Sequence, residues 1–235
     1  MMSTISKKLL QKPSFGIIML DTVFQRIPGD VGNPDTFMFP VIYEKVAGAT
    51  PEKLIIDADQ ELIRPFINAG KELIKQGAKA ISTSCGFLAL FHQELVHALD
   101  VPVFTSSLLQ VHIAQAFLRK DQKVGIITAR KQSLTHKHLS AIGISHYPLA
   151  IIGMEEAGEF SKVFITGESP LNKKLCQKEM EFKAMQLKKL HPEIGAIVLE
   201  CTNMPPYSKA IHNLTGLPVF DAVTMIKHAY LTLHT

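Results

Sequence analysis

A chain of 235 residues is long enough for one large domain or two small ones. Because 46% of its residues are hydrophobic and 20% are charged, the composition excludes a disordered chain and predicts a globular protein with a buried core. The net charge of +4 comes from scattered Lys and Arg, and the densest group, Lys173 to Lys189, is interleaved with Glu179 and Glu181. This mixture predicts a solvated helix face and argues against a nucleic-acid-binding surface.

The cysteine content and the hydrophobic runs predict where the protein is found. Three widely spaced cysteines make neither a disulfide framework nor a CxxC metal site, which favours a reducing compartment. Residues 1–13 contain lysines but no apolar run of signal-peptide length. No apolar stretch approaches the roughly 18 residues that a membrane-spanning helix needs. We therefore expect a soluble, cytoplasmic protein with no membrane partner.

Short apolar runs alternate with helical patterns through the first half of the chain. Strands are predicted at 15–20, 41–45, before Cys85 and at 101–105, and helices at 61–76, 87–99 and 106–119. The segment from Val23 to Pro40 contains repeated Pro and Gly, so it is predicted to be an irregular loop. A loop of that length within a compact protein is more often functional than accidental.

The second half continues the same alternation. Strands are predicted at 123–128, 194–200 and 219–221, helices at 133–141, 171–191 and 222–233, and a loop at 163–167. Short apolar strands that alternate with helices are typical of α/β proteins with parallel sheets. Ligands of such sheets bind in loops at the carboxyl ends of the strands.

Two stretches of the chain repeat one design, in which a buried strand ends at a cysteine. Cys85 follows AISTS and Cys201 follows IVLE, and the same number of residues separates each cysteine from a later Val-flanked proline, Pro102 or Pro218. Each strand-end cysteine is also preceded, roughly half a lobe earlier, by a Gly-Ile-Ile strand. The repeat predicts two similar α/β lobes, one at 1–108 plus 215–235 with Cys85 and one at 109–214 with Cys201.

The neighbours of the two cysteines suggest their chemistry. Small hydroxyl and amide side chains surround both thiols and are suited to hydrogen-bonding a carboxylate. A helix beginning at Phe87 would place its positive N-terminus near Cys85 and lower the pKa of that thiol. Two thiols facing each other could remove a proton from a carbon beside a carboxylate and return one to its opposite face. Either cysteine alone could equally be a small buried hydrophobe, the interpretation we favour for Cys176.

Three segments resemble the aspartate/glutamate racemase superfamily, which includes racemases together with decarboxylase and isomerase relatives. They are Phe15 to Asp21, the Ser84-Cys85-Gly86 turn and the run from Glu200 to Asn203. The resemblance covers nearly the whole chain. It implies two lobes related by a pseudo-twofold axis, an active site in the cleft between them, and two-base proton transfer without a cofactor.

The resemblance also implies roles for individual residues. Cys85 and Cys201 match the acid/base pair, and Asp21 matches an acidic residue that helps to pass a proton. The residues expected to bind substrate are Thr83, Ser84, Gly86, Thr128, Thr202, Asn203 and Asn33. The chain departs from the glutamate racemases at Gly86-Phe87 and at Asn203, and Phe87 favours a bulkier or less polar ligand than a free acidic amino acid.

The remaining features leave alternatives open. Asp21 could be only a loop acid, and Arg26 and Arg130 could bind a second substrate carboxylate or be surface charges. Neither a HExxH motif nor a phosphate-binding glycine loop is present, so no metal and no cofactor is expected. The favoured function is an amino-acid racemase or epimerase, with a small-molecule substrate and a homodimer as an open possibility. The alternatives are a decarboxylase, a cis-trans isomerase or an inactive carboxylate-binding protein.

Overall fold

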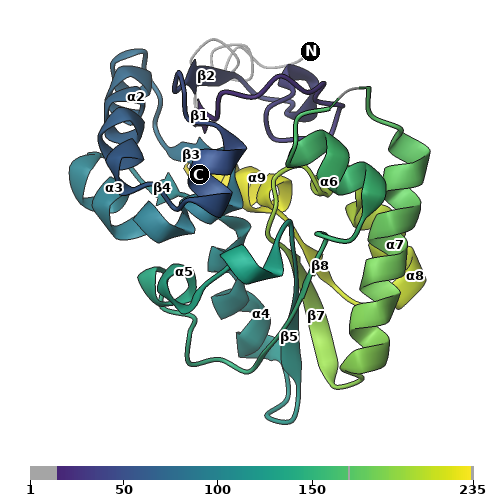
Figure 1. The fold of residues 1–235 in the computed structure, drawn as a ribbon. Coiled ribbons are helices and arrows are strands. Elements are labelled where there is room, and N and C mark those ends of the chain that lie inside the picture. Colours follow the sequence, from purple (N-terminus) through teal and green to yellow (C-terminus); the bar gives the residue numbers. More distant parts are fainter. Residues whose placement is uncertain (1–14, 169, 234–235) are drawn as a thin grey trace, which may run out of the picture.

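The computed structural model describes residues 15–168 and 170–233; residues 1–13, on which the leader-peptide expectation rests, lie outside them. Two four-stranded parallel sheets form two lobes, as predicted (Figure 1). Within the described ranges, no helix is long and apolar enough to cross a membrane. The predicted homodimer stays a prediction.

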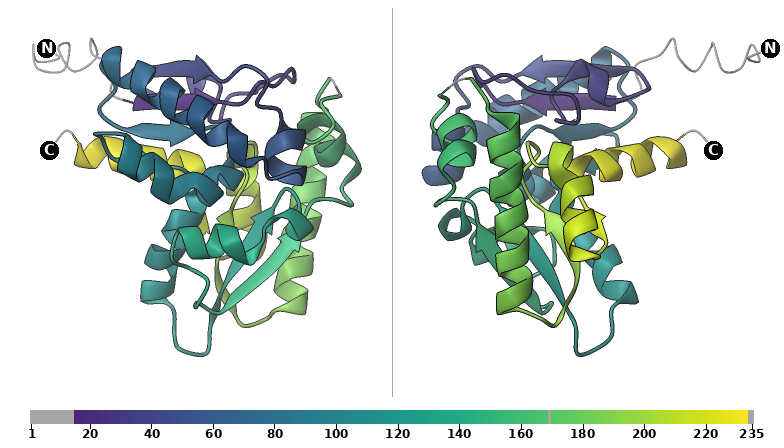
Figure 2. Two further views of the ribbon diagram at one scale, coloured as in Figure 1. Left: turned by 60° about the vertical axis from the view of Figure 1, so that its left-hand side comes forward. Right: turned by 90° about the vertical axis from the view of Figure 1, so that its right-hand side faces the viewer.

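The first sheet has the strand order β2-β1-β3-β4. Its strands are β1 (Phe15–Met19), β2 (Val41–Lys45), β3 (Ile81–Thr83) and β4 (Val103–Phe104). Successive side chains of a strand point to opposite faces, so β1 buries Ile18 in the core that contains Phe66 of α2 (Ile63–Lys75), and Ile17 in a second cluster. That second cluster contains Ala222 and Ile226 of α9 (Ala222–Thr232). The sheet therefore packs between α2 and α9 (Figure 2).

The second sheet has the equivalent order β6-β5-β7-β8. Its strands are β5 (Lys123–Thr128), β6 (Leu149–Gly153), β7 (Ile194–Leu199) and β8 (Val219–Phe220). The α-helices that accompany the two sheets, in addition to α2 and α9, are α3 (His92–Ala98), α4 (Val111–Phe117), α5 (His136–Ala141), α6 (Gly158–Phe164), α7 (Lys173–Leu190) and α8 (Ser208–Thr215). The matching strand orders give the two lobes the same topology.

The chain crosses between the lobes near its end. β8 pairs with β7 in the second sheet, whereas α9, which follows it directly, packs against Phe15 and Ile17 of the first. One core cluster also contains side chains of both lobes, such as Phe66 and Ile126. The lobe boundaries inferred from the repeat stay a prediction.

Short helical turns connect these elements. They are η1 (Pro34–Thr36), η2 (Glu52–Ile56), η3 (Gln60–Leu62), η4 (Gly86–Phe91), η5 (Ser107–Gln110), η6 (Lys131–Ser133) and η7 (Pro205–Tyr207). The predicted bounds of β2 and β5 are confirmed, but β6, α6 and α8 were not predicted, and the loop expected at 163–167 begins within α6. The helix expected from Phe87 is wrong in kind, because η4 is a 3-10 helix and α3 begins only at His92.

Candidate active site

A small cavity lies between the lobes, where β1, β3 and β7 end. Both Cys85 and Cys201 line it, together with the polar residues Ser84, Asn203, Glu200, Thr22 and Arg26. Its volume is about 20 Å³, little more than one water molecule requires. The described conformation is therefore closed, and side chains at the wall must move before a substrate enters.

The turn that carries Cys85 is held by hydroxyl groups. The Thr83 hydroxyl lies 2.9 Å from the carbonyl oxygen of Cys85 and 2.7 Å from that of Thr105. The Ser84 hydroxyl accepts a hydrogen bond of 2.9 Å from the backbone N–H of Leu20, at the end of β1. Thr83 is thus committed to the turn and does not line the cavity, whereas Ser84 does.

Gly86 allows the two cysteine turns to approach each other closely. A Cβ atom added to Gly86 would collide with both the backbone carbonyl oxygen and the carboxylate of Glu200. Any other residue at this position would push the lobes apart beside the two thiols. Gly86 therefore acts through close packing and does not line the cavity.

The turn that carries Cys201 is tied to the first lobe. The Thr202 hydroxyl donates to the carbonyl oxygen of Ser84 at 2.5 Å. The Cys201 thiol donates to Asn203 Oδ1 at 3.3 Å, and Asn203 Nδ2 donates to Asp30 Oδ2 at 2.6 Å. Because Asp30 fixes the Asn203 amide, Asn203 presents an acceptor to Cys201.

Both thiols are protonated in this closed state. Burial raises the pKa of Cys85 and that of Cys201, and the nearby Glu200 carboxylate raises both further. For Cys85, the hydrogen bond from the backbone of Phe87 and the charge of Arg26 act in the opposite direction but do not outweigh burial. The expected lowering of the Cys85 pKa by a helix N-terminus is therefore wrong for this state. The two thiols are close enough that the charge of Cys85 also raises the pKa of Cys201.

Glu200 and Arg26 supply charged groups at the cavity wall. Glu200 is fully buried, and burial raises its pKa to about 7 although Thr128 donates to its carboxylate at 2.8 Å. The Arg26 side chain is only 10% exposed, and its guanidinium donates to Asp30 at 2.8 Å and to Thr22 at 3.2 Å. Arg26 is therefore a group of the site rather than a surface charge.

Aromatic and aliphatic side chains close the rest of the cavity. Phe24 and Phe164 meet edge to face with their ring centroids 5.1 Å apart, and Phe87 and Ile55 complete the apolar wall. Phe24 comes from the segment predicted as a functional loop, and Phe164 ends α6 in the other lobe. The cavity thus combines two thiols, both signs of charge and an aromatic wall.

No protein-family model matches the chain. A dimethylsulfoniopropionate lyase from Durusdinium sp. clade D is 33% identical over 223 residues, which are 91% of this chain and 73% of that protein. The chain belongs to the dimethylsulfoniopropionate lyase family. Dimethylsulfoniopropionate lyase 3 from Emiliania huxleyi is 30% identical over 90% of this chain, and this family member spans only 57% of the length of that relative.

Solved structures confirm the fold that the resemblance implied for this member of the lyase family. A mutant of arylmalonate decarboxylase in a sulfate-associated form superimposes with a TM-score of 0.65, covers 94% of this chain and 93% of its own, and is 15% identical. Allantoin racemase from Klebsiella pneumoniae gives a TM-score of 0.64 over 94% of this chain and 89% of its own, at 14% identity. The fold is that of the aspartate/glutamate racemase superfamily. Since the sequence relatives are lyases, a racemase reaction is not confirmed for this lyase-family chain.

The structure brings only part of the predicted site to the cavity. Asp21 lies away from the thiols: its carboxylate binds Lys45 at 2.9 Å and the backbone N–H of Gly48 at 3.0 Å, and these contacts lower its pKa. Asn33 donates to the carbonyl oxygen of Arg26 at 2.7 Å and so supports the arginine segment. Thr128 and Thr202 hold Glu200 and Ser84, so in this lyase-family chain they lie behind the cavity wall.

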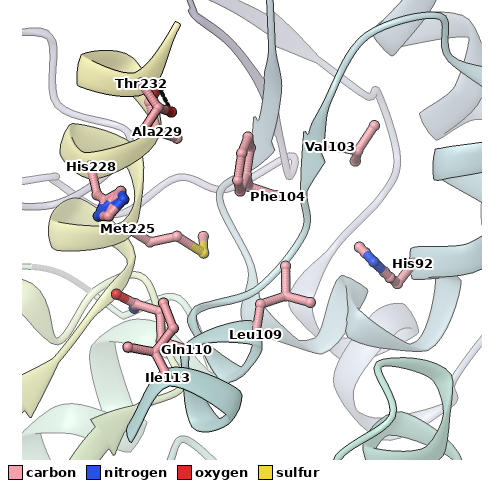
Figure 3. Close-up of a pocket in the computed structure, with 10 residues that line it drawn as sticks. All are labelled: His92, Val103, Phe104, Leu109, Gln110, Ile113, Met225, His228, Ala229 and Thr232. Atoms are coloured by element: carbon pink, nitrogen blue, oxygen red, sulfur yellow. Dashed lines mark hydrogen bonds between the residues drawn. The ribbon is translucent and has the colours of Figure 1, made fainter. Parts of the chain in front are cut away.

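A wider groove elsewhere carries none of these groups. It has a volume of about 400 Å³ and lies between β4, the start of α4 and α9, with Phe104, Ile113 and Met225 among its lining residues (Figure 3). His92 and His228 line it, but no cysteine or carboxylate does. Among the described residues, no group of three or more His, Cys, Asp or Glu is arranged to hold a metal ion. The chemistry of the lyase-family member is therefore assigned to the thiol cavity.

Proposed function

We propose that the chain is a lyase that cleaves dimethylsulfoniopropionate into acrylate and dimethyl sulfide. The observation that carries the proposal is a pair of thiols lining one closed cavity in a chain that is 33% identical to a lyase named for this substrate. The substrate is a zwitterion in which two methylene groups separate a carboxylate from a sulfonium. Its α-carbon lies beside a carboxylate, the kind of carbon from which paired cysteines were expected to remove a proton.

The reaction is a β-elimination that needs one base. A thiolate of the pair, from Cys85 or Cys201, takes a proton from the α-carbon, and the electrons of that C–H bond form the double bond of acrylate. The bond between the β-carbon and sulfur breaks, and its electron pair leaves on sulfur as neutral dimethyl sulfide. The thiol that has formed then loses its proton to solvent, so no proton returns to carbon. This is the chemical difference from racemisation, which needs two proton transfers.

The charges of the substrate favour the reactive form of the thiols. Burial raises the pKa values of Cys85 and Cys201 in the closed cavity, and a sulfonium cation placed beside them lowers these values because it stabilises a thiolate. The Arg26 guanidinium would stabilise the negative charge that develops on the substrate carboxylate as the α-proton leaves. The substrate itself therefore helps to generate the base.

Decarboxylation, supported by fold likeness alone, is the second candidate, and racemisation is the third. All three are separated by incubating the protein with dimethylsulfoniopropionate, 2-arylmalonates and single enantiomers of aspartate and glutamate. Equal amounts of dimethyl sulfide, measured by gas chromatography, and acrylate, measured by liquid chromatography, are the expected result. Carbon dioxide from the malonates, or loss of optical rotation, without dimethyl sulfide would refute the lyase proposal.

A further inference from the structure

The Glu200 carboxylate has one oxygen that the protein leaves unsatisfied. Oε2 accepts from the Thr128 hydroxyl at 2.8 Å and from the backbone N–H of Ala129 at 3.4 Å. Oε1 is buried and has no hydrogen-bond partner among the residues that the structure describes. Buried polar atoms are nearly always hydrogen-bonded, so a buried carboxylate oxygen without a partner calls for a ligand.

That oxygen lies at the reacting centre. Glu200 lines the same cavity as Cys85 and Cys201, and Oε1 lies against Gly86, between the cavity-lining residues Cys85 and Phe87. The carboxylate also acts electrostatically on both thiols. A group bound to Oε1 would therefore be held next to the two sulfur atoms.

The charges of the wall specify the sign of this group. Arg26 is compensated by its ion pair with Asp30, at 2.8 Å, which leaves Glu200 as an acid with no cation beside it in the described part of the wall. An ionised Glu200 thus gives the cavity one uncompensated negative charge. A buried charge is stable only when it is paired, so the wall is complementary to a cation.

The surroundings of Glu200 specify a cation without N–H donors. Phe24, Phe87 and Phe164 line the cavity, and aromatic faces attract alkylated cations such as sulfonium and quaternary ammonium groups. A primary ammonium group carries three N–H donors, and the one free carboxylate oxygen could satisfy only one of them. The combination therefore suits a methylated onium group.

We propose that Glu200 is the residue that binds the onium end of the substrate and so selects sulfonium over neutral carboxylates. This inference rests on the proposed lyase function, since it names the group that recognises one end of that substrate. Binding the onium at Glu200 places its positive charge beside both thiols. Glu200 is thus a specificity-determining residue that also promotes formation of the thiolate.

The test compares two unreactive ligands of nearly the same shape. In 4-methylpentanoate a neutral CH group replaces the sulfonium of dimethylsulfoniopropionate, and in 3-(trimethylammonio)propionate a quaternary ammonium replaces it. Calorimetry at pH 7.5 should show that the wild-type protein binds the ammonium compound about tenfold or more tightly than the neutral acid, a difference of about 1.4 kcal/mol. In Glu200→Gln this preference should disappear while the affinity for 4-methylpentanoate is retained.

A second measurement uses the wild-type protein alone. Because the pKa of Glu200 is about 7, binding of the ammonium compound should weaken several-fold from pH 7.5 to 5.5 and release a proton, whereas binding of the neutral acid should change less. The other groups that face Glu200 are Cys85, Cys201, Arg26 and Asp30, and the pKa values of both thiols are raised away from this range. His138, packed against Phe87, has its pKa lowered to about 4 by burial.

The outcomes separate this inference from the lyase proposal. Equal affinity of the wild-type protein for the two ligands, or a preference that persists in Glu200→Gln, overturns the role of Glu200. If Glu200→Gln does not fold, a wild-type preference that does not change with pH overturns it instead. Absence of dimethyl sulfide with an intact, Glu200-dependent preference refutes the lyase function and leaves the onium site standing.

Discussion

The hydroxyl of Thr202 donates a hydrogen bond of 2.5 Å to the backbone carbonyl oxygen of Ser84. Thr202 follows one cavity cysteine and Ser84 precedes the other, so this bond joins the two strand-end turns directly. Both groups are buried. The relative position of the two thiols therefore depends on a contact between lobes that lies beside the cavity and not in it.

Thr202→Val should loosen this connection while preserving shape. The variant leaves a buried carbonyl oxygen without this donor, which costs about 1–3 kcal/mol of unfolding free energy. We expect turnover to fall about tenfold or more, since small misplacements of reacting groups are costly. Urea denaturation and the rate of dimethyl sulfide release measure the two effects. Thr202→Ser keeps the hydroxyl and should stay near wild type; an equal loss in both variants would contradict this account.

The two cavity cysteines should be needed for turnover, and the third should not. Cys85→Ser and Cys201→Ser each replace a thiol with a much weaker acid, and removal of a catalytic base costs about 10²–10⁴-fold in rate. We expect the larger loss in kcat to identify which cysteine takes the proton. Cys176 lies buried in α7 outside the cavity, so Cys176→Ala is the matched control. Full activity in both serine variants would exclude thiol catalysis.

The sequence predicted the two-lobed fold and a shared thiol cavity because both follow from a visible repeat. Cys85 and Cys201 each end a short apolar strand, and parallel strands of two similar sheets bring such ends to one edge. The role of Glu200 could not be seen in the same way. A single acid after an apolar run looks like the first solvent-exposed residue of a loop, and only tertiary packing buries it.

The pKa error for Cys85 has a related cause. Local sequence indicates a helix after the cysteine, but the magnitude of desolvation depends on the second lobe, which closes over the thiol. The same applies to Arg26, which became part of the wall because the loop segment folds back and Asp30 pairs with it. β6 was missed because Leu149 to Gly153 offers five apolar residues without a turn or periodic signal of its own.

Phe24 should limit the size of the sulfonium group. Its ring packs against Phe164 at the closed wall, so Phe24→Ala opens space there. We expect the ratio of kcat/KM for diethylsulfoniopropionate to that for the dimethyl compound to rise about tenfold, since one methylene in an apolar pocket is worth about 1–3 kcal/mol. Phe37 is 8% exposed like Phe24 but packs in the cluster with α9, so Phe37→Ala is the control. A similar rise in both variants would place the size limit elsewhere.

The raised pKa of Glu200 also predicts how stability depends on pH. Its pKa is about 7 in the folded protein against 4.5 as its ordinary value, so between these pH values the folded state binds more protons than the unfolded state. Stability conferred by the protonated carboxyl is thus complete below pH 4.5 and is lost as the pH rises through 7. We expect the free energy of unfolding of the wild type, relative to Glu200→Gln, to fall by about 1–3 kcal/mol from pH 5 to 7.5. His138, whose pKa burial lowers to about 4, affects both proteins equally and cancels in this difference. Urea titrations of the two proteins across this range make the comparison, and parallel pH curves would show that Glu200 ionises normally.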